Sequence, residues 1–258
     1  MEQELVRRAG RLVGNARRIV VFTGAGVSTE SGIPDFRSPG GIWSRYDPDD
    51  FSFRNFLAHE KYRRIYWEYD ILTYPDIERA LPNVAHNAIV QLEKRGVVSA
   101  VITQNVDGLH QKAGTSPDKV FELHGTQREV GCLDCGRRWK REVIVERMER
   151  DGIDVPYCEH CGGPLKSATI TFGQALREDV LRSAFHHAQT CDLFLTIGSS
   201  LVVQPAALLP VLAKRAGAAL ILINLTETPY DELMDVIIRE PAAAAMEAII
   251  GTGDSLRR

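Results

Sequence analysis

The 258-residue sequence contains no run of 18 apolar residues, so we expect no membrane-spanning helix. Its first residues carry acids and lack an apolar core, which argues against a signal peptide. An excess of one charge is also missing, because 31 Lys and Arg residues face 34 Asp and Glu residues. The net charge of −3 gives no electrostatic reason to bind nucleic acid or a membrane. These absences predict a cytoplasmic protein without direct nucleic-acid or membrane partners.

Cysteine is scarce, with five residues, yet four of them form two Cys-x-x-Cys pairs. The pairs are Cys132 with Cys135 and Cys158 with Cys161, a spacing typical of tetrahedral zinc. Four thiolates leave no coordination position for water, so we expect one structural zinc ion. The alternative, two redox pairs or disulfides, fits an intracellular composition less well. Cys191 stands alone before an apolar run and is expected in the core.

The third glycine of the dinucleotide fingerprint G-x-G-x-x-G is also missing. Gly24 and Gly26 follow the apolar run 19–22, but Thr29 occupies the third position. Glycines after a buried strand let the backbone turn tightly and approach a phosphate. Residues 34–37, Pro-Asp-Phe-Arg, then place an acid, a ring and a permanent cation nearby. This combination predicts a loop that acts chemically on a dinucleotide, whereas the missing glycine argues against a dehydrogenase.

Apolar runs alternate with helical patterns along most of the chain. We expect strands at residues 19–22, 98–102, 120–123, 193–197 and 220–223. We expect helices at residues 1–16, 85–94, 178–188 and 205–216. This alternation predicts an α/β, Rossmann-like parallel sheet with helices on both faces. Polar or small residues follow every strand: Gly24, Gln104, His124, Gly198 and Asn224. Because ligands collect beyond the carboxyl ends of parallel strands, we expect one shared site there.

Two segments interrupt the alternation. Residues 40–84 are rich in aromatic residues, prolines and charges and are expected to form a helical insertion. Residues 127–167 carry the four paired cysteines and are expected to form a zinc-binding module. The remaining residues, 1–39, 85–126 and 168–258, would form the Rossmann-like, dinucleotide-binding domain.

Candidate catalytic residues follow the second and third strands. Asn105 and Asp107 alternate around Val106, so both side chains can point into one cleft. His124 ends a strand, where a pKa near neutrality suits a general base. The alternative is that Asn105 and Asp107 form a turn and His124 is structural. The other histidines of interest are interpreted as structural residues: His59, His86, His110, His186 and His187.

Taken together, these motifs resemble those of the sirtuins, the NAD-dependent protein lysine deacylases. The resemblance rests on GAG-x-S-x-x-SGIPDFR at residues 24–37, T-Q-N-x-D-x-L-H at residues 103–110 and G-S-S-L-x-V-x-P at residues 198–205. The His-Gly at residues 124–125, the four cysteines and the Ile-Asn at residues 223–224 complete it. The motifs occur in the family's order, and the layout is most similar to bacterial and archaeal single-domain members.

The resemblance implies a reaction and assigns roles in it. Asp107 and Ile33 would hold the nicotinamide carboxamide, and Asn105 would order ribose hydroxyls or a water. His124 would take a proton from a ribose hydroxyl, which then attacks the alkylamidate formed with the acyl-lysine. The products would be free lysine, nicotinamide and an O-acyl-ADP-ribose. NAD and zinc are the implied cofactors, and acyl-lysine proteins or peptides are the implied partners.

The resemblance also implies further contacts with NAD. Arg37 would neutralise phosphate charge, and Phe36 would screen nicotinamide from the sugar after the bond breaks. The remaining residues that it places at the dinucleotide site are Gly24, Ala25, Gly26, Thr29, Asp35, Gln104, Val106, Gly198, Ser199, Asn224 and Leu225.

Peptide substrate would lie as an added strand between residues 170–174 and 198–202. The implied substrate contacts are Ile170, Phe172, Gly173 and Val202. Gln174 departs from the acid that is common in the family, which affects the charge of the peptide entrance. Residues 66–69, Tyr-Trp-Glu-Tyr, lack the arginine of members that remove succinyl or malonyl groups, so a neutral acyl group is expected.

Two other functions remain open from the sequence. An ADP-ribosyltransferase or NAD glycohydrolase would use the same NAD residues, although the presence of His124 favours deacylation. A non-catalytic zinc module that binds nucleic acid has support only from the basic run at residues 137–141. The sequence leaves the oligomeric state open, with a monomer slightly favoured.

Overall fold

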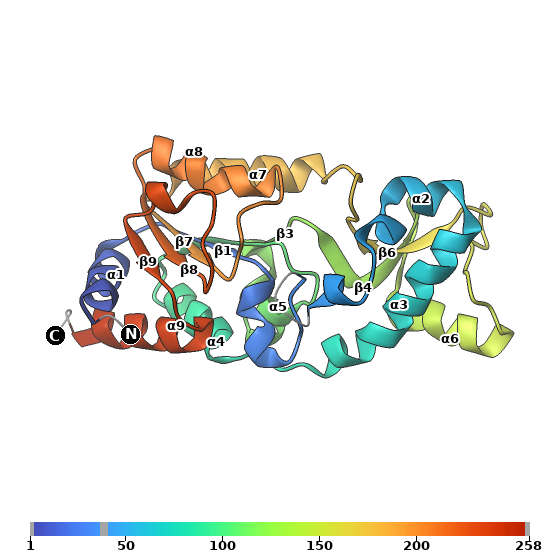
Figure 1. The fold of residues 1–258 in the computed structure, drawn as a ribbon, viewed down its shortest axis with the longest axis horizontal. Coiled ribbons are helices and arrows are strands. Elements are labelled where there is room, and N and C mark those ends of the chain that lie inside the picture. Colours follow the sequence, from blue (N-terminus) through green and yellow to red (C-terminus); the bar gives the residue numbers. More distant parts are fainter. Residues whose placement is uncertain (1–2, 37–40, 256–258) are drawn as a thin grey trace.

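The computed structural model describes residues 3–36 and 41–255. Across these residues, six parallel strands form one sheet in the order β3-β2-β1-β7-β8-β9 (Figure 1). The strands are β1 (Ile19–Thr23), β2 (Val98–Thr103), β3 (Val120–Glu122), β7 (Leu193–Ile197), β8 (Ala219–Ile223) and β9 (Val236–Ile238). The predicted parallel α/β fold is therefore confirmed.

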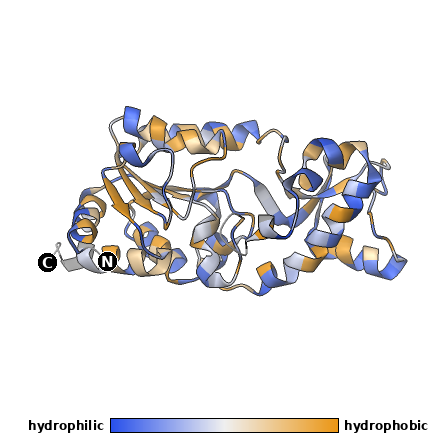
Figure 2. Ribbon diagram, viewed as in Figure 1, coloured by the Kyte–Doolittle hydropathy of each residue, from blue (hydrophilic) through white to orange (hydrophobic). Residues whose placement is uncertain are grey.

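Helices cover both faces of this sheet, as expected for strands that are apolar throughout (Figure 2). On one face lie α1 (Gln3–Asn15), α4 (Val84–Lys94) and α9 (Ala242–Ser255), and on the other lie α7 (Glu178–Thr190) and α8 (Leu209–Arg215). The helix α1 buries Val6, Ala9 and Val13, which are spaced for one helical face.

The structure corrects two details of this domain. The helix expected at residues 205–216 is divided into a 3-10 helix, η6 (Ala206–Leu208), and α8. Pro210 lies in the first turn of α8, where a missing backbone N–H costs nothing, so it favours a new helix start. The strand β9 was not expected, because its three residues are too short to give a periodic pattern.

A smaller lobe contains an antiparallel sheet of three strands among the described residues, in the order β5-β4-β6. These strands are β4 (Gly125–Cys132), β5 (Arg138–Lys140) and β6 (Leu165–Thr169). The helices beside them are α2 (Phe53–Ala58), α3 (Glu60–Arg79) and α6 (Arg141–Asp151) (Figure 1). None of these strands was expected from the sequence.

One hydrophobic core joins residues 40–84 to residues 127–167 in this lobe. Phe56 and Trp67 from the helical segment pack with Val130, Ile144 and Leu165 from the cysteine-containing segment. The Trp67 indole N–H also donates to the Leu165 carbonyl at 3.0 Å. The two segments thus form one structural unit.

Short helices complete the described part of the chain. They are η1 (Ala25–Val27), η2 (Thr29–Ser31), η3 (Ile42–Ser44), η4 (Pro48–Phe51), α5 (Leu109–Ala113), η5 (Pro117–Lys119) and η7 (Asp231–Leu233). No helix in residues 3–36 or 41–255 has the length and apolar character needed to cross a membrane.

Candidate active site and metal centre

The loops after β1 and β7 are in direct backbone contact. The Gly26 N–H donates to the Gly198 carbonyl at 2.9 Å. A Cβ at Gly198, where φ is +63°, would lie 2.3 Å from the Val27 nitrogen. A Cβ at Gly24 would lie 2.7 Å from the Gly198 oxygen. The glycines at positions 24, 26 and 198 are therefore required by loop-to-loop packing.

The path of the chain after Gly26 explains why Thr29 can stand where the fingerprint has a third glycine. After Gly26 the chain enters η1 and η2 and not one long helix that must approach the sheet closely. The Thr29 hydroxyl donates to the Gly26 carbonyl at 3.1 Å, and the side chain is exposed. The missing glycine thus reflects a different continuation of the loop.

Two backbone N–H groups at this contact are available to an anion. Within the described part of the chain, the N–H groups of Ala25 and Ser199 donate to no protein acceptor. The Ser199 hydroxyl accepts a hydrogen bond from the Gln104 side chain at 2.8 Å, which links a third loop. Unpaired amides in a glycine-lined turn fit the phosphates of a dinucleotide.

Asn105 and Asp107 meet at Ser28, as their alternation around Val106 predicts. The Ser28 hydroxyl donates to Asp107 Oδ2 at 2.8 Å. The Asn105 amide donates to the same hydroxyl at 3.1 Å and to the Gly24 carbonyl at 3.2 Å. Asp107 Oδ1 accepts the Leu109 N–H at 2.9 Å, at the start of α5. The network fixes both side chains beside the glycine loop.

His124 lies in the turn between β3 and β4, at the junction of the two lobes. Its Nδ1 lies 2.9 Å from the Gln104 carbonyl oxygen. A carbonyl oxygen can only accept, so Nδ1 carries the proton and Nε2 of the neutral ring keeps its lone pair. Burial lowers the pKa of His124, and the hydrogen bond to Gln104 partly opposes this shift. The ring is held as a neutral base.

The backbone around His124 leads directly into the smaller lobe. Gly125 has φ of +74°, and a Cβ there would lie 2.0 Å from the Ala168 oxygen. The His124 carbonyl accepts the Ile170 N–H at 2.7 Å. The candidate base and the segment after β6 are thus joined through the backbone.

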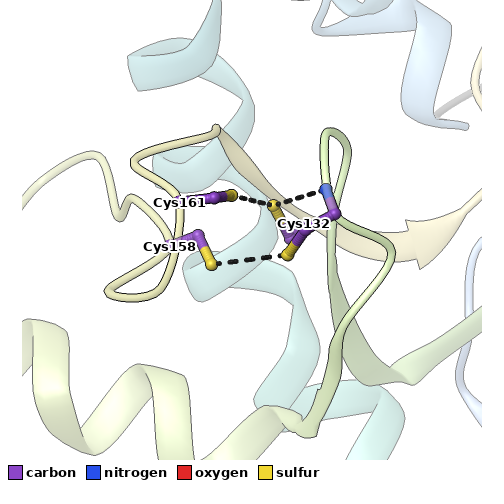
Figure 3. Close-up of side chains that lie close together, drawn as sticks. Cys132, Cys158 and Cys161 are labelled. Carbon is purple, nitrogen blue, oxygen red and sulfur yellow. Dashed lines mark hydrogen bonds between the residues drawn. The ribbon is translucent and has the colours of Figure 1, made fainter.

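The four predicted cysteines converge at one point. Figure 3 shows the side chains of Cys132, Cys158 and Cys161 close together. Their sulfur atoms all lie within 4.8 Å of one another, with Cys132 and Cys161 at 3.4 Å and Cys135 and Cys158 at 3.8 Å. Sulfur atoms around a tetrahedral zinc lie about 3.8 Å apart, whereas a disulfide requires about 2.05 Å. The cluster therefore fits one structural zinc and not two disulfides.

The sequence model of the Sir2 family matches residues 24–205, which include the glycine loop, His124 and the four cysteines. The chain belongs to the Sir2 family. An NAD-dependent protein deacetylase of Rhodopseudomonas palustris is 44% identical over 246 residues, covering 95% of this chain and 96% of that protein. The NAD-dependent protein deacylase 2 of Archaeoglobus fulgidus is 40% identical over 258 residues, covering 100% of this chain and 99% of that protein.

Solved Sir2 structures share the whole fold. A structure described under the mechanism and regulation of Sir2 enzymes has a TM-score of 0.89 and 39% identity, covering 99% of this chain and 100% of that one. A Sir2 complex with a p53 peptide and NAD⁺ has a TM-score of 0.85 and 35% identity, covering 95% of this chain and 97% of that one. The similarity extends across both lobes.

In this Sir2 chain, residues 170–174 form a turn beside exposed apolar side chains. The Gln174 N–H donates to the Thr171 carbonyl at 3.0 Å, and the Gln174 side-chain oxygen accepts the Thr171 N–H at 3.2 Å. Phe172 and Val202 are 46% and 48% exposed. The Phe172 carbonyl accepts the Phe53 N–H at 2.8 Å, which ties the turn to α2. Gln174 thus keeps the turn closed without adding charge.

The other predicted NAD contacts differ in their placement. Asn224 follows β8 directly, and its side chain donates to the Thr226 carbonyl at 2.8 Å. Leu225 is 65% exposed beside it. Ile33, Asp35 and Phe36 follow η2, whereas Arg37 lies outside the described residues.

Two residues of the site were not singled out from the sequence. Ser28 joins Asn105 to Asp107, as described above. Asn83 caps α4 by accepting the Ala85 N–H at 2.9 Å, and its amide donates to the Val27 carbonyl at 2.8 Å and to Ser31 Oγ at 3.0 Å. An asparagine immediately before a helical pattern is an N-cap signal, but its second role depends on tertiary contact.

Proposed function

We propose that this Sir2 family member is an NAD-dependent protein-lysine deacylase, which transfers an acyl group from lysine to ADP-ribose and releases nicotinamide. The observation that carries the proposal is the neutral His124, whose Nδ1 is held by the Gln104 carbonyl beside the glycine loops. The deacetylase and deacylase names of the full-length relatives support it.

The role of His124 follows from its proton positions. With Nδ1–H donated to Gln104, Nε2 accepts the proton of a ribose hydroxyl. The lowered pKa keeps this nitrogen unprotonated at neutral pH. NAD supplies the electrophilic ribose carbon and the final acyl acceptor. His124 therefore acts as general base in the acyl-transfer step.

We assign the dinucleotide to the glycine-lined contact. The N–H groups of Ala25 and Ser199 bind phosphate, with Arg37 adding positive charge. Asn105 orders the ribose hydroxyls, and Asp107 with Ile33 holds the carboxamide. The hydrogen bonds from Ser28 and Leu109 to Asp107 support this assignment, because they fix its carboxylate before a ligand binds. The other predicted contacts are Gly24, Gly26, Thr29, Asp35, Phe36, Gln104, Val106, Gly198, Asn224 and Leu225.

We assign the acyl-lysine peptide to the space between residues 170–174 and 198–202. Ile170, Phe172, Gly173 and Val202 provide its contacts by β-strand addition. The exposure of Phe172 and Val202 supports this, since their apolar surfaces suit the aliphatic stem of lysine. The link from Ile170 to the His124 carbonyl sets this segment relative to the base.

We further propose that the transferred acyl group is neutral. Tyr66 is buried, and its hydroxyl lies 3.1 Å from Thr169 Oγ1. Tyr69, where an arginine would bind a carboxylate, packs against Tyr46 at 4.9 Å and Phe51 at 5.0 Å between ring centroids. An acetyl-lysine peptide is then turned over much faster than the matching succinyl-lysine peptide. Comparable rates on both peptides would contradict this preference.

The reaction class is tested by mass spectrometry of an acetyl-lysine peptide incubated with and without NAD. We expect acetyl loss only with NAD, together with O-acetyl-ADP-ribose. His124→Ala abolishes the reaction, whereas the control His186→Ala, on the exposed face of α7, retains it. ADP-ribose attached to protein, or released without an acyl group, would favour the transferase or glycohydrolase alternative.

We place the reaction in the cytoplasm, on protein substrates and without nucleic acid. The clustered thiols require reducing conditions to bind zinc. The basic run supports little nucleic-acid affinity, because Arg141 is buried and Arg138 pairs with Glu129 at 2.8 Å. A monomer remains the simplest assembly.

A further inference from the structure

Two buried histidines lie beneath the glycine loop and have no part in the reaction proposed above. His86 belongs to α4 and His110 to α5, and they are 0% and 1% exposed. Their ring centroids are 5.0 Å apart. Among the described residues, His86 Nε2 and His110 Nδ1 are buried without a hydrogen-bond partner. Such atoms are costly unless something pairs them.

The hydrogen bond at the other nitrogen of His86 fixes its proton. His86 Nδ1 lies 3.4 Å from the backbone nitrogen of Asn83, in the capping box of α4. A backbone N–H can only donate, so Nδ1 accepts. The neutral ring therefore carries its proton on Nε2. The unpaired atom of His86 is a donor.

The opposite assignment follows for His110. The Asn105 N–H donates to Thr103 Oγ1 at 3.1 Å, and the Thr23 hydroxyl donates to the same oxygen at 2.8 Å. Thr23 Oγ1, which lies 2.9 Å from His110 Nε2, then accepts from that nitrogen. His110 carries its proton on Nε2, and its unpaired Nδ1 is an acceptor. If the Thr103 and Thr23 hydroxyls donated in the opposite direction, His110 Nε2 would accept and its proton would move to Nδ1. The two unpaired nitrogens of His86 and His110 would then both be buried N–H donors.

We propose that a small adjustment of the two rings lets His86 Nε2–H donate to His110 Nδ1, so that one hydrogen-bond chain runs from the start of α4 to Thr103 Oγ1, which also accepts the Asn105 N–H. Its members, in order, are Asn83, His86, His110, Thr23, Thr103 and Asn105. Thr23 and Thr103 end β1 and β2, where the loops with Gly24 and Asn105 begin. The two histidines are positioning residues for these loops. Their effect on NAD rests on the proposed function.

This chain of hydrogen bonds requires the rings of His86 and His110 to be neutral, with one N–H each. Burial, and secondarily the charge of His86, lower the pKa of His110 to about 3. Burial also lowers the pKa of His86, while the carboxylate of Asp107 opposes that shift. Both rings are therefore uncharged at pH 7, which the donor and acceptor assignment needs.

The first test is independent of activity. Long-range ¹H–¹⁵N correlation spectra of the ¹⁵N-labelled, zinc-loaded protein at pH 7 report which imidazole nitrogen carries the proton. His86→Gln and His110→Gln identify the two rings, and Thr115→Val, which removes an unpaired buried hydroxyl next to α5, is the control. We expect both rings as Nε2–H tautomers with bare Nδ1. A charged ring, or a proton on Nδ1 of either histidine, would overturn the proposal.

The second test compares His110→Gln with His110→Leu by NAD calorimetry. The glutamine amide can place an N–H near the former Nε2 and keep the bond to Thr23, whereas leucine cannot. We expect the NAD Kd to rise at least tenfold for leucine and to stay within about threefold for glutamine. Equal losses in two folded variants would reject the positioning role. Wild-type protein that binds NAD with the expected tautomers but leaves acetyl peptide unchanged would refute the proposed function alone.

Discussion

The carboxylate of Asp70 is buried against the guanidinium of Arg141, and each side chain is 2% exposed. The pair joins α3 to α6 across 71 residues of sequence. The Ser167 hydroxyl also donates to Asp70 Oδ1 at 2.9 Å, and the guanidinium lies 4.0 Å from the Tyr74 ring centroid. This buried ion pair holds the helical segment to the cysteine-containing segment, along with their shared core.

Asp70→Asn tests the contribution of this pair. The change leaves the Arg141 charge buried without a counter-ion, so we expect a loss of about 3–5 kcal/mol in the free energy of unfolding. Urea denaturation of the zinc-loaded protein measures it. Glu178→Gln, which removes the exposed pair with Arg182, is the control and leaves the urea midpoint unchanged. An Asp70 variant as stable as wild type would contradict the role of the pair.

Gly198→Ala tests the contact between the loops after β1 and β7. The new Cβ would lie 2.3 Å from the Val27 nitrogen, so the loops must separate. We expect the NAD Kd to rise at least tenfold, measured by calorimetry. Gly217→Ala is the matched control, because Gly217 also has positive φ, +93°, but nothing lies within 4 Å of its Cβ position.

Both alanine variants carry the strain of the left-handed backbone conformation, about 1–2 kcal/mol. Both melting temperatures should therefore fall, but only Gly198→Ala should weaken NAD binding. Equal NAD affinity in the two variants would show that close packing of the loops is not needed for the dinucleotide site.

The predictable parts of this molecule are those whose structure is indicated by residues close together in the sequence. All five residues of β1 are buried, so an uninterrupted apolar run indicated a strand in a covered parallel sheet. Zinc ligands were recognisable because Cys132 and Cys135 have the spacing of one metal-binding turn, and Cys158 and Cys161 repeat it. His124 was recognisable from its place after a strand and from the neighbouring motifs.

The unpredicted parts depend on contacts between distant residues. Nothing near Asp70 in the sequence identifies Arg141 as its partner, so the common core of the smaller lobe was not expected. The strand β4 contains the polar residues Thr126, Gln127 and Arg128, which interrupt the apolar pattern of a strand, so its pairing with β6 could not be predicted. His86 and His110 were expected to be structural, but the closeness of their rings and the two unpaired nitrogens appear only in three dimensions.

Cys132→Ser tests whether the cysteine cluster stabilises the smaller lobe. Cys132 and Cys158 are part of its hydrophobic core, so loss of a zinc ligand should also loosen α3 and α6. We expect loss of stoichiometric zinc, measured by atomic emission, and a lower melting temperature. Cys191→Ser, which alters a buried thiol outside the cluster, retains zinc. A zinc-free Cys132 variant with wild-type melting would show that the metal is not structural.

The pH dependence of deacylation tests the assignment of His124 as the base. Only the neutral ring can accept a proton, so kcat/KM rises with pH through the pKa of His124. Because burial lowers that pKa, the acid limb should have its midpoint below 6.5, the ordinary value for histidine. His186→Ala leaves the midpoint in place, since that side chain is exposed on α7. Acid-limb kinetics with acetyl-lysine peptide, paired with NMR titration of His124, give two measures of the same group. A midpoint at or above 6.5, or an NMR pKa that differs from the kinetic one, would assign the limb to another residue.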